Sequence, residues 1–208
     1  MSDTKPTQQY IRKDDRREMI AEAARALILE KGYAALRTRS VAERVGINIS
    51  TLHFHVPNKT ALVRLVAETS RDAFLALLPP RPDAQRPALA QLRAEVRAYH
   101  DSLRDRPELA ACFGQLTQVA TAEPEVAGIL DAFTQDWCRR YAEIVAIGRS
   151  QGVFRSTLQP LPAALMITGA LASFGPRGPK GLAMFWPVVD EIERSLLVPE
   201  SRECSDAD

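Results

Sequence analysis

Apolar residues recur every three or four positions through most of the chain, and no segment alternates apolar and polar residues over the length of a strand. This spacing predicts an all-α protein. The first predicted helix covers residues 14–31, with Ile20, Ala24 and Ile28 on one stripe. Gly32 follows at the position where a helix often ends in a left-handed residue.

Two short helices are predicted next, over residues 38–45 and 49–55. Gly46 provides a tight turn between them, Asn48 is placed to cap the second helix, and Pro57 ends it. The pair therefore has the dimensions of a helix-turn-helix, whose second helix enters the major groove of DNA.

A long helix is predicted over residues 59–78, and it ends at the proline-rich linker that begins with Pro79. The C-terminal part then predicts five more helices, which brings the total to about nine. They cover residues 89–103, 109–119, 126–152, 161–174 and 182–197. The sequence GPRGPKG, residues 175–181, is predicted to be the loop between the last two helices.

Charge divides unevenly along the chain, although the net charge is only +1. Residues 1–66 contain 12 Lys or Arg against 7 Asp or Glu, and the remainder contains 15 against 19, so the two parts carry +5 and −4. This asymmetry is typical of a nucleic-acid-binding segment joined to a domain with another role. Three widely spaced cysteines, Cys112, Cys138 and Cys204, indicate reduced thiols and no disulfide framework.

The first ten residues, MSDTKPTQQY, are polar, and no stretch approaches the roughly 20 apolar residues of a membrane span. We therefore expect a cytoplasmic protein without membrane contact. The domains predicted are a flexible arm at 1–10, a helix-turn-helix domain at 11–57, a helical ligand-binding and dimerisation domain at 58–199, and a polar tail at 200–208.

The seam of the helix-turn-helix is predicted to consist of small and branched side chains: Val41, Ala42, Val45, Ile47 and Leu52. Residues outside this seam offer groups that suit phosphates and base edges. Those predicted to contact DNA are Arg37, Thr38, Arg39, Asn48, Ser50, Thr51, His53, Phe54, His55 and Lys59. The alternative for any one of them is an ordinary solvated side chain.

Over about residues 17–65 the sequence resembles the tetracycline-repressor (TetR-like) family of bacterial transcriptional regulators. The residues that carry the resemblance are Ile20, Ala23, Ala24, Gly32, Tyr33, Val41, Ala42, Gly46, Ile47, Thr51, Leu52, His55, Pro57, Lys59 and Leu62. The resemblance implies that residues 48–56 form the recognition helix and that Lys59 meets a phosphate.

Three residues depart from the family pattern. Leu36 stands where a helix-capping Thr or Ser is common, His53 stands where Tyr is frequent, and Val56 stands where Phe is frequent. The change at His53 removes the aromatic hydroxyl that usually contacts a phosphate.

Beyond Leu65 the resemblance is architectural, and it implies a homodimer in which the last two helices pair with their symmetry mates. Small residues in 161–174 and apolar surface at Phe185, Trp186, Val189 and Ile192 favour the same arrangement. Such a dimer would read half-sites of a near-palindromic operator about 34–36 Å apart. The alternative is that both helices belong to an ordinary core.

A pocket for a small apolar or aromatic ligand is predicted among the helices of the C-terminal part. The resemblance to the family favours a repressor that such a ligand releases from DNA. No cofactor is predicted. The candidate lining residues, each of which is equally suited to a core, are Phe74, Tyr99, His100, Cys112, Phe113, Gln115, Trp137, Tyr141 and Met166.

An enzyme is not expected, because Gly-x-Ser-x-Gly and His-Glu-x-x-His are absent and GPRGPKG lacks the Gly-Lys-Ser/Thr of a phosphate loop. A metal site at His53 and His55 is excluded as well, because positions two apart on a helix point about 200° apart. The alternatives left open are a helical interaction module that binds no specific DNA, and a ligand-independent or activating regulator.

Overall fold

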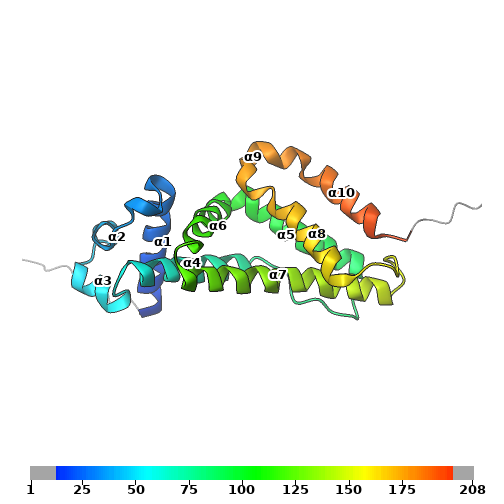
Figure 1. Cartoon of the computed structure of the whole chain (residues 1–208), viewed down its shortest axis with the longest axis horizontal. Helices are drawn as coiled ribbons and strands as arrows, with labels where there is room; N and C mark the ends of the chain where they lie inside the picture. The colour runs from blue at the N-terminus through cyan, green and yellow to red at the C-terminus, as the bar shows by residue number, and fades with distance from the viewer. Residues whose placement is uncertain (1–12, 199–208) are drawn as a thin grey trace, which may run out of the picture.

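The computed structural model describes residues 13–198, and within this range the protein is helical apart from one isolated bridge between Phe154 and Leu197 (Figure 1). The prediction of an all-α fold with about nine helices is confirmed. The longer helices are α1 (Lys13–Lys31), α2 (Thr38–Val45), α3 (Ile49–His55), α4 (Lys59–Leu75), α5 (Ala88–Asp105), α6 (Pro107–Ala120), α7 (Pro124–Ser150), α8 (Pro160–Ala172) and α10 (Phe185–Leu196).

The two short N-terminal helices have the predicted bounds because local hydrogen bonds fix their ends. Gly46 adopts a left-handed conformation with φ of +74°, which a glycine reaches without strain. Asn48 accepts a hydrogen bond from the Thr51 backbone N–H at 2.7 Å, and Asn58 does the same for Ala61 at 2.8 Å. Both asparagines are therefore N-caps of the helices that follow them.

Buried apolar residues form two clusters that meet along α4. The first cluster joins α1–α4 to one face of α6 and the start of α7, and the second joins α5, α7, α8 and α10. Leu62 and Val66 on α4 belong to the first cluster, whereas Phe74 belongs to the second. Helix α4 therefore runs continuously from the core of one part into the core of the other, and it begins at Lys59, just after the predicted domain boundary.

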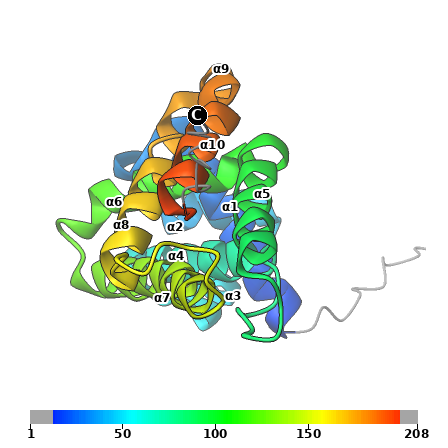
Figure 2. The same ribbon diagram turned by 90° about the vertical axis from the view of Figure 1, so that its right-hand side faces the viewer.

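The C-terminal part is built on the long α7, which lies beside α4, while α5 and α8 stand on either side of α10 (Figure 2). Helices α6, α7 and α8 each begin at a proline, at Pro107, Pro124 and Pro160, two or fewer residues before the predicted starts. Proline suits this first position because its missing N–H has no partner within the helix there.

The segment predicted to be a loop at 175–181 is helical, which corrects that expectation. It forms a 3-10 turn, η2 (Gly175–Arg177), and a four-residue helix, α9 (Gly178–Gly181). The last predicted helix is divided in turn into η3 (Leu182–Met184) and α10. Helix α4 also ends at Leu75, three residues earlier than predicted.

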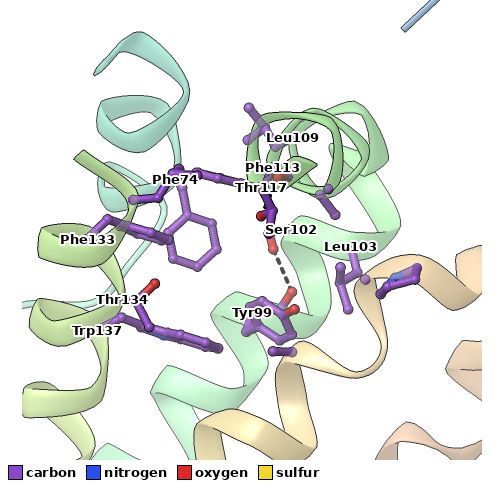
Figure 3. Close-up of a pocket in the computed structure, with 16 residues that line it drawn as sticks. Phe74, Tyr99, Ser102, Leu103, Leu109, Phe113, Thr117, Phe133, Thr134 and Trp137 are labelled. Carbon is purple, nitrogen blue, oxygen red and sulfur yellow. Dashed lines mark hydrogen bonds between the residues drawn. The ribbon is translucent and has the colours of Figure 1, made fainter. Parts of the chain in front are cut away.

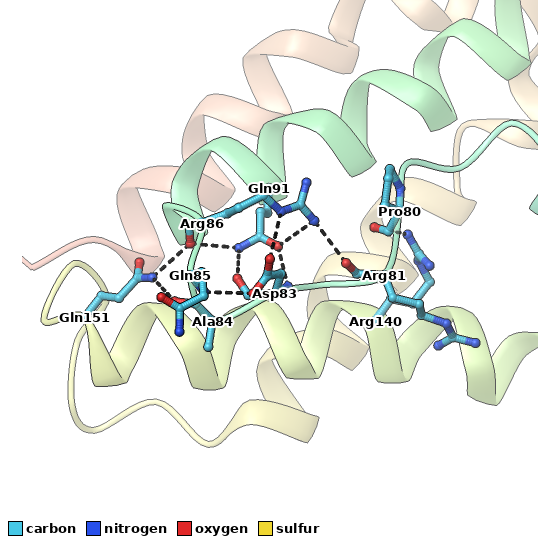
Figure 4. A network of polar contacts seen from close by, with 9 residues as sticks. All are labelled: Pro80, Arg81, Asp83, Ala84, Gln85, Arg86, Gln91, Arg140 and Gln151. Carbon is cyan, nitrogen blue, oxygen red and sulfur yellow. Dashed lines mark hydrogen bonds and ion pairs between the residues drawn. The ribbon is translucent and has the colours of Figure 1, made fainter.

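Side chains from α5 and α7 hold the proline-rich linker between α4 and α5 in place through hydrogen bonds (Figure 4). The Gln91 side chain donates to the carbonyls of Asp83 and Arg86 at 2.8 and 3.0 Å and accepts from the Asp83 N–H at 2.8 Å. Arg140 on α7 donates to the Pro79 carbonyl at 2.6 Å and forms a buried ion pair with Glu95. The linker is therefore a fixed part of the fold.

Within residues 13–198 no helix has both the length and the apolar composition that a membrane crossing requires. The predicted arm at 1–10 and tail at 200–208, which includes Cys204, lie outside the described residues.

Candidate DNA-binding face and ligand cavity

The predicted seam of the helix-turn-helix is present. Val41, Ala42 and Leu52 are buried, and Val45 and Ile47 are half-buried against the same cluster. The close packing of α2 and α3 follows from the small side chain of Ala42 and the turn at Gly46.

The outer face of α3 carries several of the residues predicted to contact DNA. Ser50 and His53 are exposed, and Phe54 is exposed over 77% of its surface. The Phe54 ring meets the ring of His55 edge-on, with centroids 5.3 Å apart. An exposed aromatic ring of this kind lowers solubility and is typical of a surface that contacts a partner. Asn48 is exposed as well, and Thr51 is half-buried.

His55 lies between α3 and α1 rather than on the outer face. Its Nδ1 atom is shut off from solvent without a hydrogen-bond partner, and Arg17 donates to its backbone carbonyl at 3.4 Å. Burial lowers the pKa of His55, and the nearby charges of Arg16, Arg17 and Lys13 lower it further. We therefore expect a neutral imidazole that fixes α3 against α1.

The start of α2 differs from the expectation drawn from the family pattern. Leu36 is buried in the core, and the capping position is occupied by Arg37, whose side chain makes no capping bond. Its guanidinium instead donates to the carbonyls of Ala34 and Leu36 at 2.7 and 3.0 Å. Thr38 is half-buried as the first residue of α2, and Arg39 is exposed beside Glu43 at 3.5 Å.

Lys59 is engaged within the protein. Its ammonium donates to the Tyr33 carbonyl at 3.0 Å and lies 4.0 Å from the centroid of the Tyr33 ring. Burial lowers the pKa of Lys59, with a further lowering from the charge of Arg37. Lys59 thus anchors the turn after α1 to the first turn of α4, and this role was not predicted from the sequence.

The turn between α6 and α7 is bonded to the DNA-binding part. The Tyr33 hydroxyl donates to one Glu123 carboxylate oxygen at 2.9 Å, and Thr60 donates to the other at 3.3 Å. Arg64 on α4 pairs with Glu125 at 3.2 Å. Sequence analysis missed these contacts, because the partners are more than 60 residues apart and nothing local links them.

A cavity of about 300 Å³ lies between α4, α5, α6 and α7 in the C-terminal part (Figure 3). Of the nine predicted lining residues, Phe74, Tyr99, Phe113 and Trp137 line it. Sequence analysis missed Phe133 and three polar side chains, which are Ser102, Thr117 and Thr134. Among residues 13–198, no charged side chain lines the cavity.

The aromatic rings of the cavity pack on one another. Phe74 meets Tyr99, Phe113, Phe133 and Trp137 edge-on, with centroids 5.3 to 6.2 Å apart. Phe113 and Phe133 stack at 5.0 Å, and Tyr99 lies 5.1 Å from Trp137. Such contacts hold the lining in place before any ligand arrives.

Three of the remaining predicted residues are packed elsewhere in the core. Cys112 lies at the junction of α1, α4 and α6, with its sulfur 3.6 Å from the Ser70 hydroxyl, which accepts from Arg25 at 3.2 Å. Tyr141 is fully buried behind Trp137. His100 is half-buried against Phe185 and Trp186, and its Nδ1 atom lies 3.1 Å from Asp101.

The last two predicted residues face outward. Gln115 lines a surface groove beside the cavity, and Met166 on α8 is exposed over 71% of its surface. Met166 belongs to an apolar surface on α8 that also includes Leu161 and Leu165. Met184, the last residue of η3, is exposed as well.

The exposed apolar surface of the last helices differs from the one predicted for a dimer contact. Phe185 and Val189 on α10 are buried inside their own chain, and Trp186 and Ile192 are half-buried. Helix α8 instead carries three exposed large apolar side chains, of which Leu165 is 57% exposed.

Two comparisons of sequence locate the resemblance in the N-terminal part. The model of the family described as "Bacterial regulatory proteins, tetR family" matches residues 20–66. The class D tetracycline repressor of Escherichia coli and the class H repressor of Photobacterium damsela subsp. piscicida are each 43% identical over 51 residues, 24% of this chain. The match spans 23% of the length of these curated relatives.

Solved structures resemble the chain over most of its length. A putative TetR-family transcriptional regulator from Rhodococcus sp. has a TM-score of 0.75 at 19% identity and covers 86% of this chain and 99% of its own. A putative transcriptional regulator from Saccharomonospora viridis, in complex with choline, has a TM-score of 0.71 at 22% identity, covering 89% and 100%. At this identity the likeness establishes the fold.

Helices α2 and α3 and the turn at Gly46 together form a helix-turn-helix with an exposed face on α3. Residues 20–66, which include this helix-turn-helix, match the TetR family of bacterial regulatory proteins, and the chain as a whole has the fold of a solved putative TetR-family regulator.

Proposed function

We propose that this protein is a homodimeric repressor that binds a near-palindromic DNA operator and releases it when a small molecule occupies the cavity. The observation that carries the proposal is the double role of α6. Its residues Phe113 and Thr117 line the cavity, whereas Leu116 and Val119 pack with α1 and α4 in the core of the DNA-binding part. One rigid element therefore touches both sites.

Recognition would be made by α3 in the major groove. Ser50 and His53 present polar groups to base edges and phosphates, and the exposed ring of Phe54 suits the methyl group of thymine. Lys59 would contact a phosphate beside α3, since its ammonium uses one of its three N–H donors on the Tyr33 carbonyl and keeps two.

Release would follow from the packing of α6. A ligand between α5, α6 and α7 favours a conformer in which α6 is displaced, because packed cores shift between discrete arrangements rather than deforming smoothly. Displacement of α6 moves the turn that carries Glu123, and with it the hydrogen bonds to Tyr33 and Thr60. Operator affinity then falls by the difference in ligand affinity between the two conformers.

A dimer would be formed through the apolar face of α8. Leu161, Leu165 and Met166 lie on this helix with most of their surface exposed, and a two-fold axis through such a face would bury it against itself. The two recognition helices would then address half-sites about 34–36 Å apart.

The proposal is tested by selecting bound sequences from a random DNA library with the purified protein and titrating the selected DNA at two salt concentrations. One near-palindrome should be enriched, and affinity should fall steeply with salt, because Lys and Arg release counterions from phosphates. A helical interaction module would enrich no sequence, and that result would remove DNA recognition from the proposal.

Phe54→Ala should weaken binding to the selected operator by about 10-fold, which corresponds to roughly 1.4 kcal/mol for a lost contact with a base. Binding to unrelated DNA and the salt dependence should stay unchanged, because the ring carries no charge. Arg39→Ala is the matched comparison: it should weaken both kinds of DNA alike and reduce the salt slope by about 1. Equal effects of the Phe54 variant on both DNAs, measured by fluorescence anisotropy, would contradict a base contact.

A further inference from the structure

Within residues 13–198, three polar groups of the cavity lining have no hydrogen-bond partner in the protein: the hydroxyls of Tyr99 and Thr134 and the Nε1 of Trp137. Tyr99 is 8% exposed, yet its phenolic hydroxyl makes no hydrogen bond within residues 13–198. Burial alone raises the pKa of Tyr99 to about 12, so the hydroxyl keeps its proton at neutral pH. The Trp137 Nε1 is fully enclosed whereas the Tyr99 hydroxyl is not, so a ligand acceptor in the cavity can reach the Tyr99 donor.

Of the three other hydroxyls in the lining, two already donate within the protein, whereas the Thr134 hydroxyl donates to no group within residues 13–198. Ser102 donates to the Tyr99 carbonyl at 2.6 Å, and Thr117 donates to the Phe113 carbonyl at 2.9 Å (Figure 3). These two groups offer lone pairs to the cavity, whereas Tyr99 offers a proton.

A cation would find little to hold it. No Asp or Glu lines the cavity, so a positive charge would enter a low-dielectric space without a counter-ion. The ring faces that attract cations are partly covered, because Phe113 and Phe133 stack on each other and Tyr99 lies against Trp137. An anion would be disfavoured for the same reason, since no Lys or Arg lines the cavity.

The volume limits the size of the occupant. At about 300 Å³ the cavity is roughly twice the 150 Å³ space that holds one benzene molecule in a protein core. A flat compound of two fused rings therefore fits, and its faces and edges match the edge-on packing of the lining.

A route inward exists between α6 and η2. Ala110, Gly114 and Gly175 line both the cavity and an adjacent surface groove of about 750 Å³. A Cβ atom added at Gly114 would meet nothing within 4 Å, so this position on α6 opens onto free space.

We infer that the effector of this protein is an uncharged bicyclic aromatic compound with a hydrogen-bond acceptor, and that the Tyr99 hydroxyl donates to that acceptor. The inference rests on the proposed function only in taking the cavity as the effector site.

Three probes of matched shape test it: quinoline, which is neutral and carries one acceptor nitrogen, naphthalene, which has none, and N-methylquinolinium, which is a cation. Equilibrium dialysis against the full-length protein, in the absence of DNA, should give quinoline about 3- to 10-fold tighter binding than naphthalene, as expected for one net hydrogen bond. N-methylquinolinium should bind at least 10-fold more weakly than quinoline. Tighter binding of the cation, or no binding of any probe, would overturn the inference.

Three variants test where the contact lies. Tyr99→Phe should reduce quinoline binding to the level of naphthalene and leave naphthalene unchanged, whereas Tyr141→Phe, which removes a buried hydroxyl outside the cavity, should alter neither. Gly114→Leu should abolish binding of both neutral probes while circular dichroism shows an intact helical fold. Equal quinoline affinity in wild type and Tyr99→Phe would overturn the role of the hydroxyl.

The failures of the two proposals are separable. If an operator is selected but no probe binds, DNA recognition stands and the inferred ligand class is wrong. If quinoline binds through Tyr99 but leaves operator affinity unchanged, the ligand class stands and ligand-induced release is wrong.

Discussion

Replacing Arg140 with methionine is expected to lower the free energy of unfolding by about 3–5 kcal/mol, because the substitution leaves the carboxylate of Glu95 buried without its counter-ion. Glu95 is 1% exposed and Arg140 5% exposed, and burial raises the pKa of Glu95 despite the neighbouring guanidinium. The variant also loses the hydrogen bonds to the carbonyls of Pro79 and Pro80. Urea denaturation followed by circular dichroism at one fixed protein concentration measures the change.

A double variant separates the effect of the unpaired charge on stability from the effect of altered packing. Glu95→Leu combined with Arg140→Met should recover most of the lost stability, since a buried pair replaced by apolar residues of similar volume is often neutral or stabilising. Arg104→Met, which removes an exposed pair with Asp105, should change stability by less than about 1 kcal/mol. A double variant as unstable as Arg140→Met alone would show that the unpaired carboxylate is not the cause.

Leu165→Glu is expected to convert the dimer to a monomer and to weaken operator binding by about 100-fold or more. The substitution places a charge at the centre of the exposed apolar face of α8, where a paired surface would bury it without a partner. Loss of the dimer removes the gain from binding two linked half-sites, which commonly amounts to 10²–10⁴. Light scattering after size-exclusion chromatography gives the mass, and fluorescence anisotropy gives the affinity.

The matched control is Leu77→Glu, since Leu77 is also exposed but lies outside α8, just after α4. This variant should remain dimeric and keep its operator affinity within about threefold. A Leu165→Glu protein that stays dimeric would instead require another interface, such as the outer face of α10.

The DNA-binding part was predictable because short-range signals determine it. Gly46, Asn48 and Asn58 fix the ends of α2, α3 and α4 through bonds to residues three or four positions away, and these bonds can be read from the sequence. The seam of Val41, Ala42 and Leu52 follows from the same periodicity.

The ligand part was predictable only in outline, because periodicity identifies an apolar stripe but not the helix that it meets. Four of the predicted residues line the cavity: Phe74, Tyr99, Phe113 and Trp137. Met166 has an equally apolar side chain but faces outward from α8. Phe185 and Val189 were expected at a dimer surface and instead fill their own core. The helices between which an apolar stripe packs are determined by contacts between segments that are distant in the sequence. The hydrogen bond between Tyr33 and Glu123 is one such contact.

Helix α6, which contacts both the cavity and the core of the DNA-binding part, would also affect the ligand concentration at which the protein responds. Coupling between two binding equilibria is reciprocal, so if a ligand lowers operator affinity by some factor, the operator lowers ligand affinity by the same factor. Protein already bound to DNA would then require a higher effector concentration than free protein. The induction threshold measured in a cell should consequently exceed the dissociation constant measured on the isolated protein, and the ratio of the two would report the strength of the coupling through α6.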